Sequence, residues 1–110
     1  MIAIIMSSAL VVVGMQGAIA APRTAFVACL KDASAKAESG NVAVANYQAF
    51  IANACANEAN ALKAALVAFD VKNGIKKAQA ETDAQAQIDD YHAMSLEKYE
   101  YKKGGGKPQS

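Results

Sequence analysis

The only histidine of the chain lies beside two carboxylates, in the run Asp89-Asp90-Tyr91-His92. Residues three apart share a face of a helix, so Asp89 and His92 could offer two ligands to a divalent metal ion. Two ligands do not make a tight site, and no second histidine or cysteine pair completes this one. A solvated helix surface is the simpler interpretation, and we predict no bound metal and no cofactor. The face of Asp89, Asp90 and His92 is the candidate for weak metal or small-ligand binding.

The other reactive residues give little support to catalysis. Ser95 follows His92 closely, but no nucleophile elbow or oxyanion-hole motif accompanies it. The glycines at 104–106 follow the last helical segment and open no helix, which does not fit a phosphate-binding loop. Glu58 interrupts an apolar stripe, and we expect it to pair with a lysine of the next helix or to extend toward solvent. We therefore predict that the protein is not an enzyme, a small hydrolase being the least supported alternative.

Cys29 and Cys55 are the only cysteines, and each is predicted to lie on the apolar face of its own helix. In an exported protein this arrangement predicts a structural disulfide, which would stabilise the fold by about 3.5 kcal/mol in the chain-entropy model. The alternatives are free thiols or an intermolecular bridge. Redox or metal chemistry generally needs closer cysteine spacing or more ligands.

The first 22 residues carry no charged side chain. An apolar run from Ile2 to Met15, followed by Ala18-Ile19-Ala20, predicts a signal peptide at residues 1–20 with cleavage near Ala20, although basic residues are missing at its start. The alternatives are an uncleaved anchor in the inner membrane, since the segment is long enough to cross a bilayer, and a buried helix. We expect a periplasmic or extracellular protein that contacts a membrane only if this segment remains.

The segments that position these residues are predicted to be helices. Alanine, which has the highest helix propensity, supplies 26 of the 110 residues, and neither 42–72 nor 75–102 contains proline or glycine. We predict an all-α fold of three helices at 23–39, 42–72 and 75–102, packed as an antiparallel bundle in one domain at 21–103. A disordered tail is expected at 104–110.

Punctuating residues predict the ends of these helices. Pro22 is expected in the first turn, Gly40 in a left-handed terminating position, Asn41 as the next N-cap, and Asn73-Gly74 as a second break. Apolar residues recur at helical spacing in three stripes. The first comprises Phe26, Cys29, Leu30, Ala33 and Ala37; the second Val44, Tyr47, Ile51, Cys55, Leu62, Leu66 and Phe69; the weaker third Ile75, Ala78, Ile88, Tyr91, Ser95 and Tyr99.

The run Cys55-Ala56-Asn57-Glu58, followed by Leu62 and Leu66, resembles the helical, cysteine-bridged domain of the periplasmic lysozyme-inhibitor family. The resemblance covers about a dozen residues, and the spacing back to Cys29 is longer than in that family. It implies an inhibitor of a cell-wall enzyme as one alternative function, without assigning a role to any residue.

The charge balance is close to neutral, with 11 basic and 10 acidic residues that are interspersed except near the C-terminus. Nucleic acid is therefore not an expected partner. Alanine-rich helix faces allow another helix to approach closely. We predict an exported helical protein that acts without catalysis, through contact with another envelope protein or with a second copy of itself. Weak metal or small-ligand binding is the alternative from a different class.

Overall fold

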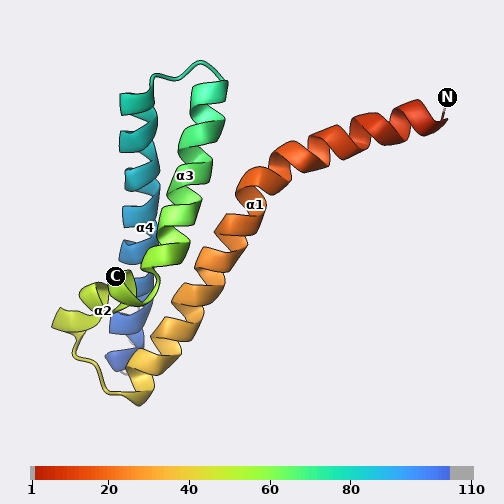
Figure 1. Cartoon of the computed structure of the whole chain (residues 1–110). Coiled ribbons are helices and arrows are strands. Elements are labelled where there is room, and N and C mark those ends of the chain that lie inside the picture. Colours follow the sequence, from red (N-terminus) through yellow and green to blue (C-terminus); the bar gives the residue numbers. More distant parts are fainter. Residues whose placement is uncertain (1, 105–110) are drawn as a thin grey trace.

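The computed structural model describes the backbone of residues 2–104 and the side chains of residues 18–104. This part of the chain consists of four helices without a strand (Figure 1). They are α1 (Ile2–Ser39), α2 (Val44–Ala54), α3 (Ala56–Lys72) and α4 (Lys77–Lys103). The all-α prediction is confirmed, whereas the predicted number of three helices is wrong. Most of the predicted signal segment and residues 105–110 of the predicted tail lie outside the described side chains.

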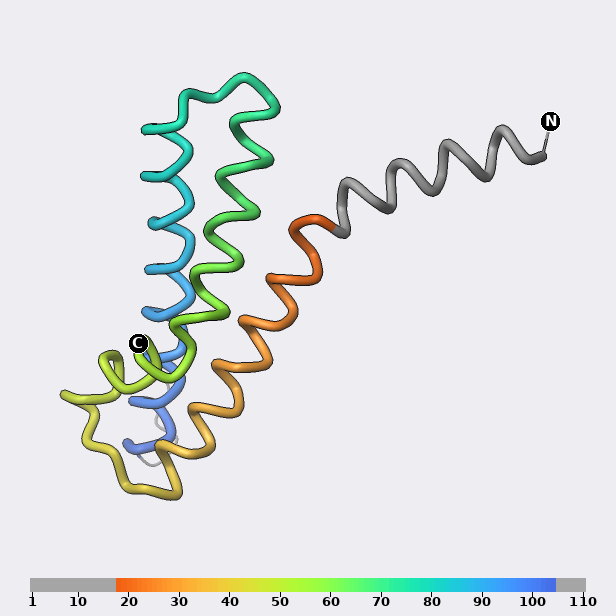
Figure 2. The backbone as a smooth tube through the Cα atoms, in the orientation of Figure 1, coloured from red at the N-terminus to blue at the C-terminus, as the bar shows by residue number. Residues whose placement is uncertain are grey.

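The helices pack around α3, which lies between α1 and α4 (Figure 2). The turn at 73–76 joins α3 and α4 into an antiparallel hairpin, and α3 also runs antiparallel to α1 (Figure 1). As a consequence, α1 and α4 run in the same direction. Arg23 lies opposite Gln87 near one end of their contact, and Ala37 lies opposite Tyr99 near the other.

The predicted helix at 42–72 is divided at Cys55, which joins α2 to α3. The backbone of Cys55 leaves helical geometry at φ −113° and ψ 26°, although the neighbouring sequence contains neither glycine nor proline. Cys55 forms the predicted disulfide with Cys29, with Cα atoms 5.9 Å apart. A straight helix would carry Cys55 about one turn beyond Cys29, and the change of direction between α2 and α3 removes this mismatch. The sequence around Cys55 contains no glycine or proline that would predict a break. The bridge to Cys29 belongs to the tertiary structure, and local sequence does not show it.

The ends of α1 also differ from the prediction. Its described residues continue through Pro22 rather than beginning at 23. A proline inside a helix removes one backbone donor and its ring clashes with the carbonyl four residues before it, so this position disfavours the helix that surrounds it. If residues 1–20 are removed, Pro22 again falls in a first turn. At the other end, Asn41 rather than Gly40 adopts the left-handed conformation, at φ 57°. The Val42 amide then donates to the Ala37 carbonyl, which completes a Schellman-type ending with Asn41 in the position usually taken by glycine.

The predicted stripes of α1 to α3 largely form the core, since Phe26, Tyr47, Ile51, Cys55 and Leu62 are fully buried. The stripe of α4 is shifted in its first half. Ala80 and Ala84 are buried there, whereas Ile75 precedes the helix and is 41% exposed. Counting back from Tyr99 in steps of three or four reaches Ile88, Ala84 and Ala80, which places Ile75 and Ala78 off the buried face. Phe69, predicted to be buried, is also exposed.

Two tyrosines connect α2, α4 and the end of α1. Tyr47 and Tyr99 are fully buried and stack with ring centroids 4.0 Å apart and an interplanar angle of 13°. The Tyr99 hydroxyl donates to the Val42 carbonyl and lies 3.3 Å from the Ala37 carbonyl. The Tyr47 hydroxyl is 2.6 Å from that of Ser95. Both tyrosine hydroxyl groups therefore have hydrogen-bond partners, as polar atoms in a protein core normally do.

Replacing Tyr99 by phenylalanine is expected to lower the free energy of unfolding by about 1 kcal/mol, because the part-buried Val42 carbonyl loses the hydroxyl as its donor while the ring stays. Tyr99→Ala should cost about 3–5 kcal/mol through the cavity it creates. Denaturant unfolding followed by circular dichroism measures both changes. Tyr101→Phe, at a ring that is 40% exposed, is the control and should leave stability unchanged. Equal midpoints for Tyr99→Phe and the wild type would contradict the assigned hydrogen bonds.

Reduction of the disulfide, or the double substitution Cys29→Ser and Cys55→Ser, is expected to lower the free energy of unfolding by about 3.5 kcal/mol. The bridge closes a loop with a sequence separation of 26 residues, and its loss releases the unfolded chain from that constraint. Unfolding curves with and without a reductant provide the measurement. Curves that coincide would show that packing alone holds α1 against the junction of α2 and α3.

Candidate functional site

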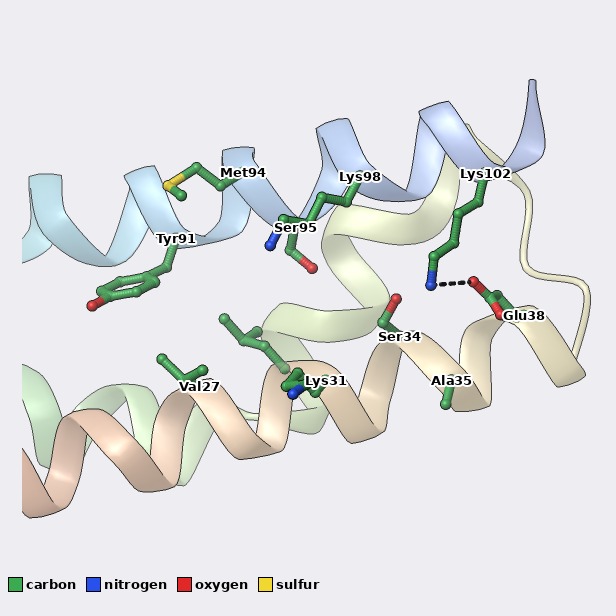
Figure 3. A pocket seen from close by; sticks show the side chains of 11 residues that line it. Val27, Lys31, Ser34, Ala35, Glu38, Tyr91, Met94, Ser95, Lys98 and Lys102 are labelled. Carbon is green, nitrogen blue, oxygen red and sulfur yellow. Dashed lines mark ion pairs between the residues drawn. The ribbon is translucent and has the colours of Figure 1, made fainter. Parts of the chain in front are cut away.

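A groove of about 530 Å³ lies between α1 and α4 (Figure 3). Val27, Lys31 and Ser34 line it from α1, while Tyr91 and Ser95 extend into it from α4 (Figure 3). Its lining spans Val27 to Glu38 on one helix and Tyr91 to Lys102 on the other. At a rise of 1.5 Å per residue, each wall is about 17 Å long, or about three helical turns.

α1 and α4 contact each other at the two ends of the groove. The residues between these contacts are too small to fill the space, so the groove stays open. At one end Phe26 packs edge to face on Tyr91, with ring centroids 5.4 Å apart. At the other, Lys102 forms an ion pair of 3.1 Å with Glu38 (Figure 3). Between these contacts the lining includes the short side chains of Ser34, Ala35 and Ser95, which leave the space unfilled.

The floor and rim of the groove differ in chemistry. Its apolar lining includes Val27 and Met94, which are 37% and 55% exposed, together with the mostly buried Leu30. Exposed apolar side chains along one groove are typical of interaction sites, and methionine adapts its shape to different partners. The charged lining residues are three lysines and one glutamate: Lys31, Lys98, Lys102 and Glu38. The lining of the groove therefore combines apolar side chains with an excess of cationic ones.

The three residues of the predicted ligand face lie in different surroundings. His92 is half-buried and packs edge to face against Phe26 of α1, with ring centroids 5.9 Å apart. Asp89 is exposed and accepts a hydrogen bond of 2.9 Å from Gln85, and Asp90 is exposed. Within residues 18–104, no group of three or more histidine, cysteine, aspartate or glutamate side chains is arranged to hold a metal ion. His92 therefore faces the helix packing, and Asp89 belongs to the outer surface of α4.

Ser95 and Glu58, the two other candidates from the sequence, make contacts that serve the fold. Ser95 contacts Tyr47 and lines the groove, and no histidine hydrogen bond activates it in the described part. Glu58 is half-buried in the first turn of α3, where a carboxylate stabilises the helix dipole. It makes no ion pair among the described side chains. In contrast, Asp32 and Lys36 form the pair that their spacing predicts, at 3.1 Å on the surface of α1.

The groove itself was not predicted from the sequence. The predicted apolar stripes and the predicted ligand face include none of Val27, Lys31, Met94 and Lys98. A signal was available in principle, because the exposed apolar residues Val27 and Met94 stand just outside their helices' buried stripes. The predicted antiparallel bundle implies that the first and last helices run in the same direction, but which of their residues face each other depends on how α3 packs between them.

In comparisons with known proteins, no family model, no curated protein and no solved structure matches this chain. The geometry of the groove is therefore the basis for assigning a function.

Burial lowers the pKa of His92 from its ordinary value of 6.5, although the Asp89 carboxylate acts in the opposite direction. The buried Nε2 has no hydrogen-bond partner among the described residues, so a proton there would be poorly accommodated. As the pH falls below about 6.5, the unfolded chain takes up this proton first. The contribution of neutral His92 to stability is complete above that pH and is lost as the pH falls through the folded-state pKa.

We therefore expect the melting temperature to decrease between about pH 7.5 and pH 5.5, and to decrease less in His92→Gln, which removes the only side chain with an ordinary pKa in this range. Thermal unfolding followed by circular dichroism at several pH values measures both profiles. Parallel profiles for the two proteins would contradict the lowered pKa. Asp90→Asn, on the exposed side of the same helix, serves as the control.

Proposed function

We propose that the protein acts without catalysis, as an exported helical protein that binds a partner protein in the groove between α1 and α4. The observation that carries this proposal is the exposure of Val27 and Met94 inside a groove edged by lysines. Apolar side chains left open between two helices are the usual receptor for the apolar face of a third helix. The recorded hydrogen bond of Ser95 in the groove joins it to Tyr47 and not to a base, which favours binding over turnover.

The partner that fits best is an acidic amphipathic helix of about three turns. Such a helix matches the length of the groove walls and would present apolar side chains at positions i, i+3 or i+4, and i+7 to Val27 and Met94. Lys31 and Lys98 would face its acidic side chains at the rim, since Lys102 is already paired with Glu38. The groove is a partly open space and not an enclosed cavity, so one side of a helix could enter it.

A second copy of the chain is a less suitable occupant. Two grooves placed face to face would bring lysines against lysines, and like charges across an interface oppose association. Weak metal binding at Asp89, Asp90 and His92 is less supported, because these three side chains are not among any group arranged to hold a metal ion in residues 18–104. Inhibition of a cell-wall enzyme is one form that binding to an envelope protein could take, and it rests on the short sequence resemblance alone.

Export is supported by two observations. The disulfide between Cys29 and Cys55 is typical of an oxidising compartment. The uncharged sequence at residues 1–20 fits a cleavable signal peptide, with Ala18 and Ala20 before the expected cleavage point. Within the described residues, none of the helices has both the length and the apolar character needed to cross a membrane.

A photo-crosslinking amino acid at Met94, introduced in the native host, tests this function. We expect a discrete adduct whose crosslinked peptide belongs to an acidic amphipathic helix. The double substitution Lys31→Glu and Lys98→Glu should reduce the adduct by about tenfold or more through charge repulsion, whereas Lys31→Arg and Lys98→Arg should preserve it. The matched control places the same crosslinker at Glu97, an exposed residue of α4 outside the groove.

Adducts of equal yield at positions 94 and 97 would contradict a specific groove complex. An adduct that survives the charge reversal would contradict the acidic partner, and a crosslink between two copies of this chain would replace it with self-association.

A further inference from the structure

The turn between α3 and α4 carries a second concentration of exposed apolar side chains. Phe69, Val71 and Ile75 are 37%, 44% and 41% exposed and lie within seven residues of one another. None of residues 67–79 is buried. Half of the large exposed apolar side chains in the described part thus lie at this one turn. Packing within the chain gives no reason for them, because Asn73 and Gly74 alone are sufficient to make the turn.

Three lysines accompany these apolar residues. Lys72, Lys76 and Lys77 are all exposed, and none of them belongs to an ion pair in the part of the chain that the structure describes. Asp70 is the only acidic residue between 69 and 77, so this segment carries a net charge of +2. The near-neutral charge of the whole chain conceals this local excess. Basic and apolar side chains combined at one exposed turn are the chemistry of contact with an anionic bilayer surface.

The position of the turn favours a lipid surface over a protein partner. It forms the end of the α3–α4 hairpin, remote from α2 and from the C-terminal end of α4 (Figure 1). The hairpin end projects away from α2 (Figure 1), and an open hollow of about 480 Å³, lined in part by Val71, Lys77 and Glu81, lies beside it. A fluid bilayer interface accommodates such a projection without a matching cavity, whereas a protein partner would need one.

We propose that the α3–α4 turn, residues 69–77, is a docking surface for anionic lipid bilayers. Phe69, Val71 and Ile75 enter the interface, and Lys72, Lys76 and Lys77 contact the acidic headgroups. The binding is peripheral and reversible, since three apolar side chains and three lysines provide far less affinity than a spanning helix. This surface is separate from the groove between α1 and α4, so either one can be correct without the other.

The absence of tryptophan from the chain makes a direct test available. Ile75→Trp places a single fluorescent reporter at the turn, in the protein purified as its host processes it. We expect its emission to shift to the blue with vesicles of phosphatidylglycerol and phosphatidylcholine, and not with vesicles of phosphatidylcholine alone. Removing each lysine by Lys→Gln should weaken binding about fivefold, and added salt should weaken it further. Cosedimentation of the unlabelled wild type and of Val71→Ser checks binding without the reporter.

The matched control is Tyr101→Trp, which places the reporter at an exposed aromatic position near the other end of α4. It should show no blue shift with either vesicle. A shift at position 101 that equals or exceeds that at position 75 would overturn the proposal, because it would locate the contact at the basic C-terminal end. Equal binding to neutral and anionic vesicles would also overturn it, since that result indicates an apolar anchor elsewhere. An absence of binding to anionic vesicles would do the same.

Discussion

The disulfide between Cys29 and Cys55 is the constraint on which the remaining structure depends. It fixes the middle of α1 to the junction of α2 and α3. On one side of the bridge, α2 brings Tyr47 against Tyr99 of α4. On the other, α3 runs back along α1 and separates it from the first half of α4. Alanine side chains remove little apolar surface from water, so the covalent link maintains an arrangement that burial alone would hold weakly.

The apolar core is distributed unequally along the molecule. The fully buried large side chains are those of Phe26, Tyr47, Ile51, Leu62 and Tyr99, whereas α4 contributes only Ala80 and Ala84 before Ile88. The end of the α3–α4 hairpin therefore depends mainly on helix hydrogen bonds and should open more readily than the bridged end. The groove belongs to the better-packed part of the molecule, where its walls are held at both ends. The two proposed surfaces thus differ in rigidity as well as in chemistry.

Interactions between residues close in the sequence predicted most of the helices. The errors come from contacts between residues that are distant in the sequence. Spacing identified the buried faces around Phe26, Ile51 and Leu62, and Asn73-Gly74 marked the turn, because these signals act within a few residues. The break at Cys55 could not be predicted, since its cause is a bond to a residue in another helix. The left-handed position at the end of α1 is taken by Asn41 and not by Gly40 as predicted. Both residue types can adopt this conformation, so the sequence alone did not distinguish them. The groove depends on which residues of α1 face α4 across it, and no local pattern in either helix encodes this register.

The parallel course of α1 and α4 has a consequence for the order of folding. Residues that meet across their contact, such as Arg23 and Gln87, are 64 positions apart, whereas α3 and α4 meet across a short turn. Contacts between distant positions form late because the intervening chain must first be ordered. The bridge removes 26 residues from that separation. Closing the bridge therefore shortens the chain between the contacting residues of α1 and α4, and the groove is expected to form faster in the oxidised protein.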